Sequence, residues 1–313
     1  MTTLHSIGET ALIERLQQRL FSGHDVVVGP GDDCAVVRAQ GEDWLLTSDP
    51  VIEGVHFEST TKPNTIGHKA IARALSDIAA MGGVPRWALV NLVVPEATPV
   101  ERLESIYDGL AATARLHAIA VVGGDVSAGP VLELHLFAVG SLPCNSALLR
   151  SGAKPGDAIF VTGALGGSGL DDHHLTFTPR VREGLWIRSG GWATAMCDIS
   201  DGLATDLHHL TEASQVGAEI ELRALPCSGA TDQTDDPIAH ALSDGEDFEL
   251  LFTVPARQVS AFPSAWRRAF DLHCTCIGEI TANRSVVARH PDGRRTPLAA
   301  KGYDHFKARA EPS

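Results

Sequence analysis

The chain contains the segment Asp198-Ile199-Ser200-Asp201-Gly202, in which two aspartates flank a serine and precede a glycine. Short carboxylate side chains on glycine-rich backbone suit hard cations such as Mg²⁺, which take oxygen ligands. A single aspartate beside a glycine is most often an ordinary turn or a helix cap. Four further segments combine aspartate with glycine or serine at predicted turns, however, and together they favour cation binding over ordinary turns, although their spacing does not show that they converge in space: Gly29-Pro30-Gly31-Asp32-Asp33, Thr47-Ser48-Asp49, Leu75-Ser76-Asp77 and Gly123-Gly124-Asp125.

Length and composition predict two domains of ordinary size, because 313 residues exceed what one hydrophobic core usually organises. Hydrophobic residues make up 44% of the chain, which is enough for a sizeable core. Acidic residues outnumber basic ones 39 to 25, giving a formal net charge of -14. This charge argues against nucleic acid or an anionic membrane as a partner, and a polyanionic substrate would need metal as a bridge.

The N-terminal segment predicts an amphipathic helix and not a signal peptide, since Leu12, Ile13, Leu16 and Leu20 recur at helical spacing among polar side chains. No apolar run approaches the roughly 20 residues that a membrane span requires. The six cysteines lack any Cys-x-x-Cys spacing, which indicates reduced, mostly buried thiols. The sequence therefore predicts a soluble, cytoplasmic protein.

Alternating strand, turn and helix patterns predict an α/β (α+β) fold. Strands are expected at residues 26–28, 44–46, 88–94, 131–139, 158–162, 218–222 and 249–254, and helices at 65–81, 101–117 and 201–213. A turn-rich stretch covers residues 141–157, and we place the domain boundary there. Residues 1–143 are expected to form the N-terminal domain and residues 144–313 the C-terminal domain.

The helix expected at 65–81 carries Lys69, Arg73 and Asp77 on one face at i, i+4 spacing. Two interpretations of Asp77 stay open: a surface salt bridge to Arg73, or a metal ligand. The chain has no Gly-x-x-x-x-Gly-Lys-Ser/Thr loop and no kinase His-Arg-Asp or Asp-Phe-Gly set, so metals would have to hold any phosphate. A zinc hydrolase is disfavoured by the absence of His-Glu-x-x-His.

Eight motifs together give the chain a resemblance to the thiamine-monophosphate kinase family, within the aminoimidazole ribonucleotide synthetase-like superfamily. They follow the family order over nearly the whole chain: GPGDDC at 29–34, SDPVIEGVHF at 48–57, LSDIAAMG at 75–82, GGD at 123–125, RSGAKPGD at 150–157, DISDGL at 198–203, GEDFELL at 245–251 and KGYDHF at 301–306.

The resemblance implies a two-domain fold in which the N-terminal domains of two subunits pair through a barrel-like dimer interface. It implies phosphorylation of thiamine phosphate to thiamine diphosphate, with ATP as co-substrate and several Mg²⁺ ions. The implied Mg²⁺ ligands are Asp32, Thr47, Ser48, Asp49, Asp77, Asp125, Asp198 and Asp201. The implied ATP contacts are Gly124, Asp125, Arg150 and Ser200, and the implied thiamine phosphate contacts are His56, Glu246 and Tyr303.

No catalytic base is expected for this reaction, because the attacking phosphate oxygen is already ionised near neutral pH. Three features depart from the family pattern. Val126-Ser127-Ala128 follows Asp125 where an arginine is usual, Ala74 replaces a common asparagine, and the segment at 166–181 is short. Two alternatives stay open: another ATP-using enzyme of the same superfamily, and a catalytically idle nucleotide-binding paralogue.

Overall fold

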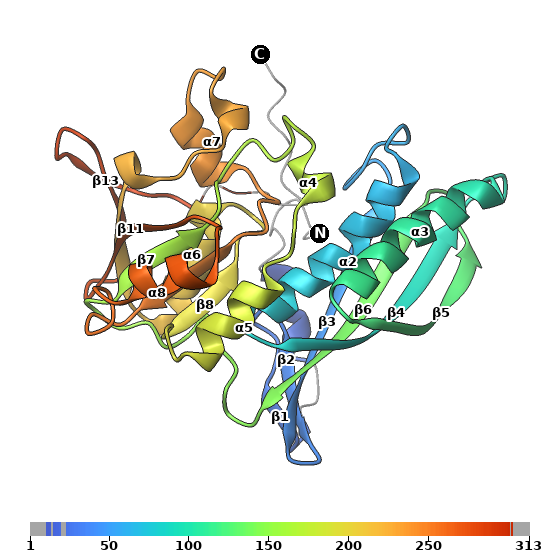
Figure 1. The fold of residues 1–313 in the computed structure, drawn as a ribbon, viewed down its shortest axis with the longest axis horizontal. Helices are drawn as coiled ribbons and strands as arrows, with labels where there is room; N and C mark the ends of the chain where they lie inside the picture. Colours follow the sequence, from blue (N-terminus) through green and yellow to red (C-terminus); the bar gives the residue numbers. More distant parts are fainter. Residues whose placement is uncertain (1–10, 14, 20–22, 301, 303–313) are drawn as a thin grey trace.

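We describe the fold from a computed structural model, which covers residues 11–13, 15–19, 23–300 and 302. Two α/β units lie side by side, each built on its own sheet (Figure 1). This arrangement confirms the expected fold class. Residues 11–13 and 15–17 are helical, as expected near the N-terminus, whereas residues 1–10, 14 and 20 lie outside the described part of the chain. None of the helices in the described part combines the length and the apolar character that a membrane crossing requires.

The first unit contains a six-stranded sheet with the strand order β1-β2-β3-β6-β4-β5. Helices α2 and α3 pack against each other and cover one face of this sheet (Figure 1). The elements of this unit are β1 (Val26–Val28), β2 (Ala35–Ala39), β3 (Glu42–Ile52), α2 (Pro63–Ala80), β4 (Val84–Val94), α3 (Val100–Leu116), β5 (Ala120–Ala128) and β6 (Glu133–Pro143).

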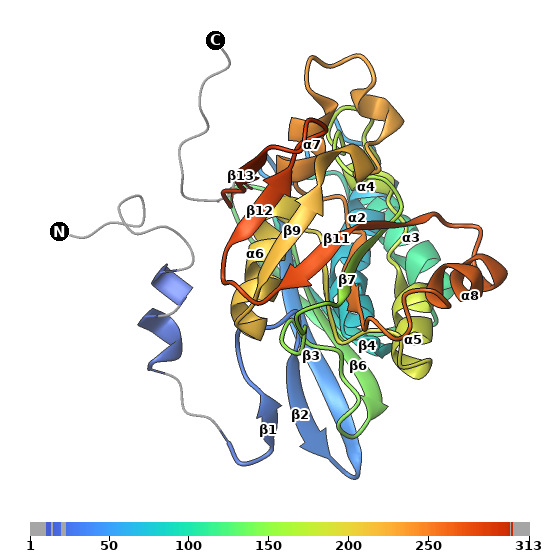
Figure 2. The same ribbon diagram turned by 90° about the vertical axis from the view of Figure 1, so that its left-hand side faces the viewer.

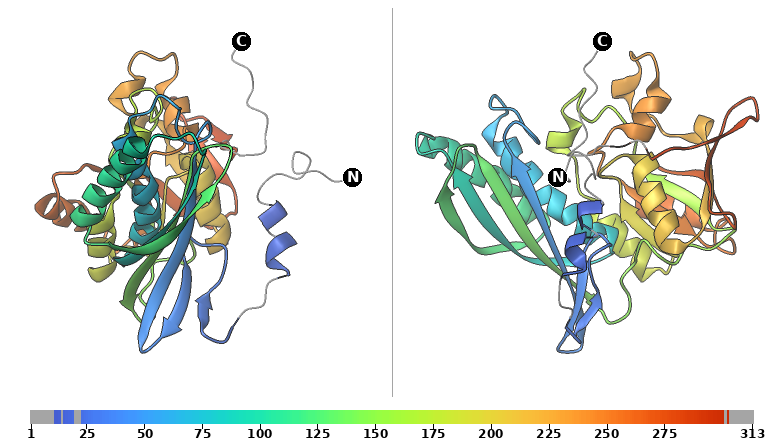
Figure 3. Two further views of the ribbon diagram at one scale, coloured as in Figure 1. Left: turned by 90° about the vertical axis from the view of Figure 1, so that its right-hand side faces the viewer. Right: turned by 180° about the vertical axis from the view of Figure 1, so that it is seen from behind.

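Alternating side chains in β4 give the first sheet one covered face and one open face. Ala88, Val90 and Leu92 are buried on the covered face, whereas Trp87 and Leu89 are 44% and 45% exposed on the other. In the view from behind, helices α2 and α3 lie on the other side of the sheet from this open face (Figure 3, right panel). The sheet therefore presents large apolar side chains to its surroundings.

The second unit contains a seven-stranded sheet with the strand order β13-β12-β9-β11-β7-β10-β8. Helices α6 and α7 supply core residues such as Leu207 and Ala241 on one face, and helices α5 and α8 supply Ile187 and Trp266 on the other. The elements are β7 (Ala158–Thr162), α4 (His173–Thr176), α5 (Val181–Ser189), β8 (Ala195–Asp198), α6 (Leu203–Ser214), β9 (Gly217–Glu221), η1 (Leu222–Ala224), η2 (Gly229–Thr231), α7 (Pro237–Ser243), β10 (Leu250–Val254), α8 (Phe262–Ala269), β11 (Cys274–Thr281), β12 (Val286–Arg289) and β13 (Arg295–Pro297).

The expected strands fall on β1, β3, β4, β6, β7, β9 and β10, and the expected helices fall on α2, α3 and α6. The boundary that we propose at 143/144 coincides with the end of β6. Two predicted turns are wrong, because Thr47-Ser48-Asp49 lies inside β3 and Gly123-Gly124-Asp125 lies inside β5. The Leu75-Ser76-Asp77 segment likewise lies within helix α2 and not at a turn.

Glycine usually weakens a strand, and the Gly123-Gly124 pair therefore led to the prediction of a turn where strand β5 lies. Gly124 has a φ of +155°, and a Cβ added there would lie 1.8 Å from the carbonyl oxygen of Val90. Glycine is therefore needed at this position for β5 to approach β4 closely. Strands β2, β8, β11, β12 and β13 were also not predicted from the sequence.

Candidate active site

Helix α2 organises the candidate site through one polar face. Arg73 lies four residues after Lys69 and three and four residues before Ser76 and Asp77, so the four side chains share that face, while the opposite face is buried in the core. Each of these four side chains contacts a residue from another element. The helix therefore connects the first sheet to the loops of the second unit.

Three carboxylates gather around the C-terminal half of α2. The Thr47 hydroxyl donates a hydrogen bond to Asp77, and the Ser76 hydroxyl donates one of 2.5 Å to Asp198, at the end of β8. Burial raises the pKa of Asp77 well above its usual range, and the charges of Asp49 and Asp198 raise it further. Close, buried carboxylates of this kind repel one another unless protons or cations neutralise them.

Asp77 therefore does not form the surface salt bridge to Arg73 that one interpretation of the sequence proposed. No hydrogen bond or ion pair joins these two residues within the described part of the chain. Arg73 instead pairs with Glu246 and Asp49. That interpretation is wrong, and the metal-ligand interpretation of Asp77 remains a proposal.

Asp32 and Asp33 lie beside this cluster, in the loop between β1 and β2. The Asp32 carboxylate accepts a 3.1 Å hydrogen bond from the backbone N–H of Arg150. Burial and the neighbouring Asp33 charge raise the pKa of Asp32 to about 7. Asp33, which belongs to the same aspartate segment but was not among the expected ligands, pairs with the guanidinium of Arg150 at 2.6 Å. In this structure Arg150 therefore connects the β1–β2 loop to the second unit.

The loop after β8 carries Ser200 and Asp201, and Asp206 of α6 holds it in place. Asp206 Oδ2 accepts hydrogen bonds of 3.1 Å from the backbone N–H groups of both loop residues. Asp201, Asp206 and His209 place one donor atom each within 4.8 Å of one another, which is a spacing that a metal ion could use. An acidic residue in the first turn of a helix was the signal that could have identified Asp206.

The loop at residues 244–248 places Glu246 beside the loop that follows β8. Its backbone N–H donates to the Ser200 carbonyl at 2.8 Å, and its φ is +66°, which is unusual for a residue with a side chain. Lys69 Nζ donates to Glu246 Oε2 at 2.9 Å and to the His56 carbonyl at 2.7 Å. Lys69, to which the sequence analysis gave no role, therefore contacts two predicted substrate-binding residues, His56 and Glu246.

Lys69 is fully buried, which is uncommon for a lysine. Burial lowers its pKa to about 8, although the nearby Glu246 carboxylate opposes this shift. At pH 7 the side chain is therefore still mainly protonated. A protonated lysine in this position holds the Glu246 side chain in place.

Several predicted site residues do not join this cluster within one chain. Ser48 is exposed and lies on the opposite face of β3 from Thr47 and Asp49, because side chains alternate along a strand. Gly124 and Asp125 are exposed on the edge strand β5, three strand spacings or roughly 14 Å from β3. Tyr303 lies outside the described residues.

The donor set fits a hard divalent cation. It consists of carboxylate and hydroxyl oxygens. Asp33 Oδ2 and Asp49 Oδ2 are buried and have no hydrogen-bond partner among the described residues. Buried carboxylate oxygens without a proton donor are costly unless a cation is bound to them. We therefore consider the cluster suitable for Mg²⁺.

The short segment at 166–181 is packed firmly against this site. The His68 ring forms a 2.8 Å hydrogen bond with the Phe177 carbonyl oxygen. The Phe177 ring stacks on Phe248, with the ring centroids 4.0 Å apart. Arg180 forms an ion pair with the buried Glu249. The segment thus still forms a wall beside the loop that carries Glu246.

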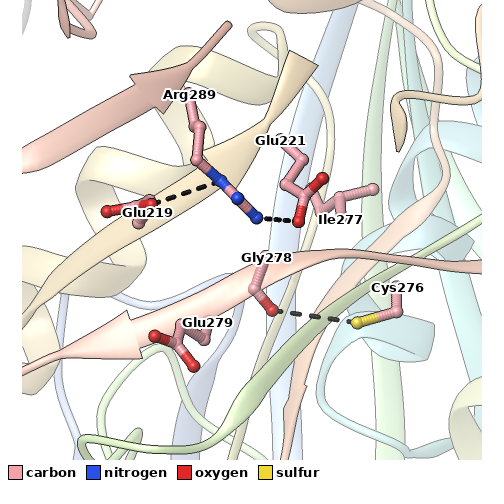
Figure 4. Close-up of a pocket in the computed structure, with 7 residues that line it drawn as sticks. All are labelled: Glu219, Glu221, Cys276, Ile277, Gly278, Glu279 and Arg289. Atoms are coloured by element: carbon pink, nitrogen blue, oxygen red, sulfur yellow. Dashed lines mark hydrogen bonds and ion pairs between the residues drawn. The ribbon is translucent and has the colours of Figure 1, made fainter. Parts of the chain in front are cut away.

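Strands β12, β9 and β11 of the second sheet lie side by side (Figure 2). They carry a separate pocket of about 260 Å³ (Figure 4), and strands β7 and β10 separate them from β8. Arg289 of β12 reaches across it to Glu219 at 3.4 Å and to Glu221. These ion pairs satisfy much of the charge in the pocket. Its lining consists of Glu219, Glu221, Cys276, Ile277, Gly278, Glu279 and Arg289.

The chain matches two family models that together define its class. Residues 31–142 match the N-terminal domain of AIR synthase related proteins, and residues 170–290 match the corresponding C-terminal domain. The thiamine-monophosphate kinase of Escherichia coli K12 is 37% identical over 96% of this chain and 98% of its own length. The chain therefore belongs to the thiamine-monophosphate kinase family.

Solved structures agree with this assignment. AaThiL complexed with AMPPCP and TMP is 33% identical, covers 98% of this chain and 99% of its own, and superimposes with a TM-score of 0.85. The thiamine-monophosphate kinase of Stenotrophomonas maltophilia K279a is 35% identical, covers 92% of this chain and 96% of its own, and has a TM-score of 0.75.

Proposed function

We propose that the protein transfers the γ-phosphoryl group of ATP to thiamine phosphate, forming thiamine diphosphate and ADP. The observation that carries this proposal is the polar face of α2, which joins the carboxylate cluster at Asp77 to Glu246. A cation site and an acceptor site side by side are what phosphoryl transfer between two anions requires. The relative solved with AMPPCP and TMP supports the choice of substrates.

The reaction needs the two substrates in line. An oxygen of thiamine phosphate attacks the γ-phosphorus, and the bond from that phosphorus to the bridging oxygen of ADP breaks. Mg²⁺ held by the carboxylates would neutralise the phosphates and stabilise charge on the transferred group. Asp32, Thr47, Asp49, Asp77, Asp198 and Asp201 are the proposed ligands from this cluster. Ser200 and Arg150 are proposed to contact ATP, and His56 and Glu246 are proposed to contact thiamine phosphate, as is Tyr303.

The protein should form thiamine diphosphate from ATP and thiamine phosphate only when a divalent cation is present. An acidic site without metal repels triphosphate, so ATP should raise the melting temperature appreciably with Mg²⁺ and hardly at all in EDTA. Chromatography of the products and thermal melts would measure both effects. Equal melting shifts in EDTA would contradict the metal bridge. Mg²⁺-dependent ATP binding without thiamine diphosphate would favour the idle-paralogue alternative.

We also propose that the protein is a homodimer in the cytoplasm. On the open face of the first sheet, Leu89 is 45% and Phe137 50% exposed, and Trp87 stacks on Trp44. The edge strand β5 adds Val126, which is 65% exposed. Contiguous apolar surface of this kind is typical of an interface. Within one chain, Ser48, Gly124 and Asp125 lie outside the carboxylate cluster. If two subunits paired through the open face, these three residues would lie against the partner subunit.

Light scattering after gel filtration should therefore give twice the mass of one chain. Phe137→Glu places a charge on the open face and should shift the protein toward monomer. Glu133→Gln, on the same strand, serves as a control that adds no charge. A monomeric wild type at micromolar concentration would contradict the dimer without affecting the two-domain fold.

A further inference from the structure

Arg73 lies between the carboxylate cluster around Asp77 and the loop that carries Glu246. Its Nη1 donates to Glu246 Oε1 at 2.9 Å, and its Nη2 lies 3.6 Å from Asp49 Oδ1. Its guanidinium carbon also lies over the ring of Phe248, 5.7 Å from the centroid. One side chain thus faces both a proposed metal ligand and a proposed substrate contact.

Most of the hydrogen-bonding capacity of this guanidinium is unused. A guanidinium has five N–H donors, and one of them serves Glu246. Nε is buried and has no hydrogen-bond partner among the described residues, and the 3.6 Å approach to Asp49 is too long for a hydrogen bond. A planar set of free donors suits a phosphate, which arginine binds through two parallel N–H groups.

The charges around Arg73 also favour an anion. Glu246 pairs with both Lys69 and Arg73, each at 2.9 Å. The charges of Asp77 and Asp198, like that of Asp49, also favour the Arg73 cation. In the function proposed above, all three aspartates serve metal cations and no longer balance the guanidinium. Two cations then face one carboxylate, and a surplus positive charge with 15% of the arginine side chain exposed remains at the site. A phosphate anion would compensate that surplus.

We propose that Arg73 binds the phosphate group of thiamine phosphate and makes the enzyme select a phosphorylated acceptor. This inference rests on the function proposed above. It assigns to helix α2 the phosphate-binding guanidinium that the chain lacks after Asp125, where Val126-Ser127-Ala128 follows. The rigid helix holds the guanidinium at the junction of the metal cluster and the Glu246 loop, so the phosphate is oriented for attack.

Steady-state kinetics of Arg73→Met and Arg73→Lys test this assignment. Loss of a charged hydrogen bond should raise the KM for thiamine phosphate roughly 10- to 100-fold in Arg73→Met, with the KM for ATP changed less than about twofold. Arg73→Lys keeps the charge and should recover part of the loss. Arg38→Met is the matched control, because it removes an arginine paired with the buried Asp43 away from the site. It should leave both KM values unchanged.

Chemical rescue separates contact with substrate from a structural role. In Arg73→Ala, added guanidinium ion should restore kcat/KM for thiamine phosphate, whereas sodium ion at the same ionic strength should not. An unchanged KM for thiamine phosphate in Arg73→Met, or an equal rise in the KM for ATP, would overturn the assignment. An inactive wild type would contradict the proposed function itself, so the two failures are distinguishable. Should Arg73→Met fold poorly, thiamine phosphate-induced melting shifts of Arg73→Lys decide the question.

Discussion

Asp77→Asn is expected to lower kcat/KM for thiamine diphosphate formation by about 100-fold or more, because it removes one charge from a proposed cation ligand. The substitution preserves the shape of the side chain and leaves an oxygen that can accept the Thr47 hydrogen bond. The loss should therefore be chemical and not structural. Initial rates over a range of Mg²⁺ concentrations should show a higher concentration needed for half-maximal activity.

The same substitution, although it lowers activity, should not destabilise the metal-free protein. In the metal-free protein, burial and the charges of Asp49 and Asp198 raise the pKa of Asp77 above its unfolded value. A raised carboxyl pKa contributes stability below about pH 4, and this stability is lost as the pH rises through the folded-state value. Asparagine does not titrate. At pH 8 without metal, the variant should melt at or above the wild-type temperature, and the difference should shrink toward pH 4.

Asp108→Asn on helix α3 is the matched control, since Asp108 is exposed and lies outside the carboxylate cluster. It should leave both activity and stability close to those of the wild type. Near wild-type activity of Asp77→Asn would remove Asp77 from the ligand set. A lower melting temperature at pH 8 without metal would contradict the electrostatic argument for this cluster.

The fold could be predicted from the sequence wherever one face of an element is buried. Helix α2 and strand β4 alternate apolar and polar side chains at periods of 3.6 and 2, and both were found. Strand β5 carries two adjacent glycines and is exposed throughout, so no such alternation marks it. The aspartate beside each glycine or serine pointed to turns, whereas pairing with β4 and β6 keeps these segments extended.

The sequence could predict the chemistry of the site but not the contacts within it. The aspartate segments indicated a cation site, and the structure brings Asp49, Asp77 and Asp198 together around one helix. The partners of Lys69 and Arg73 could not be predicted, because Glu246 lies 177 and 173 positions further along the chain. Local spacing says nothing about such distant contacts. The open apolar face and the isolated Asp125 also emerge only from the sheet order.

Thiamine phosphate is expected to be the acceptor and free thiamine is not. Within the described part of the candidate site, Lys69 and Arg73 are cations that hold Glu246, and the carboxylates are the proposed metal ligands. No group of this set is proposed as a base for an alcohol. A hydroxyl whose pKa is far above 7 needs such a base, and general-base assistance contributes about 10²- to 10⁴-fold.

A phosphate monoester arrives deprotonated, can share its oxygens with Mg²⁺ and can pair with a guanidinium. Phosphorylation of thiamine should therefore be slower than phosphorylation of thiamine phosphate by about 10²- to 10⁴-fold, because the missing base is not replaced. Initial rates with each acceptor, ATP and Mg²⁺ measure this ratio directly. A faster reaction with thiamine would require a base that abstracts the hydroxyl proton. Both the in-line transfer between phosphates and the proposed acceptor would then be wrong, even though the fold and the family would stand.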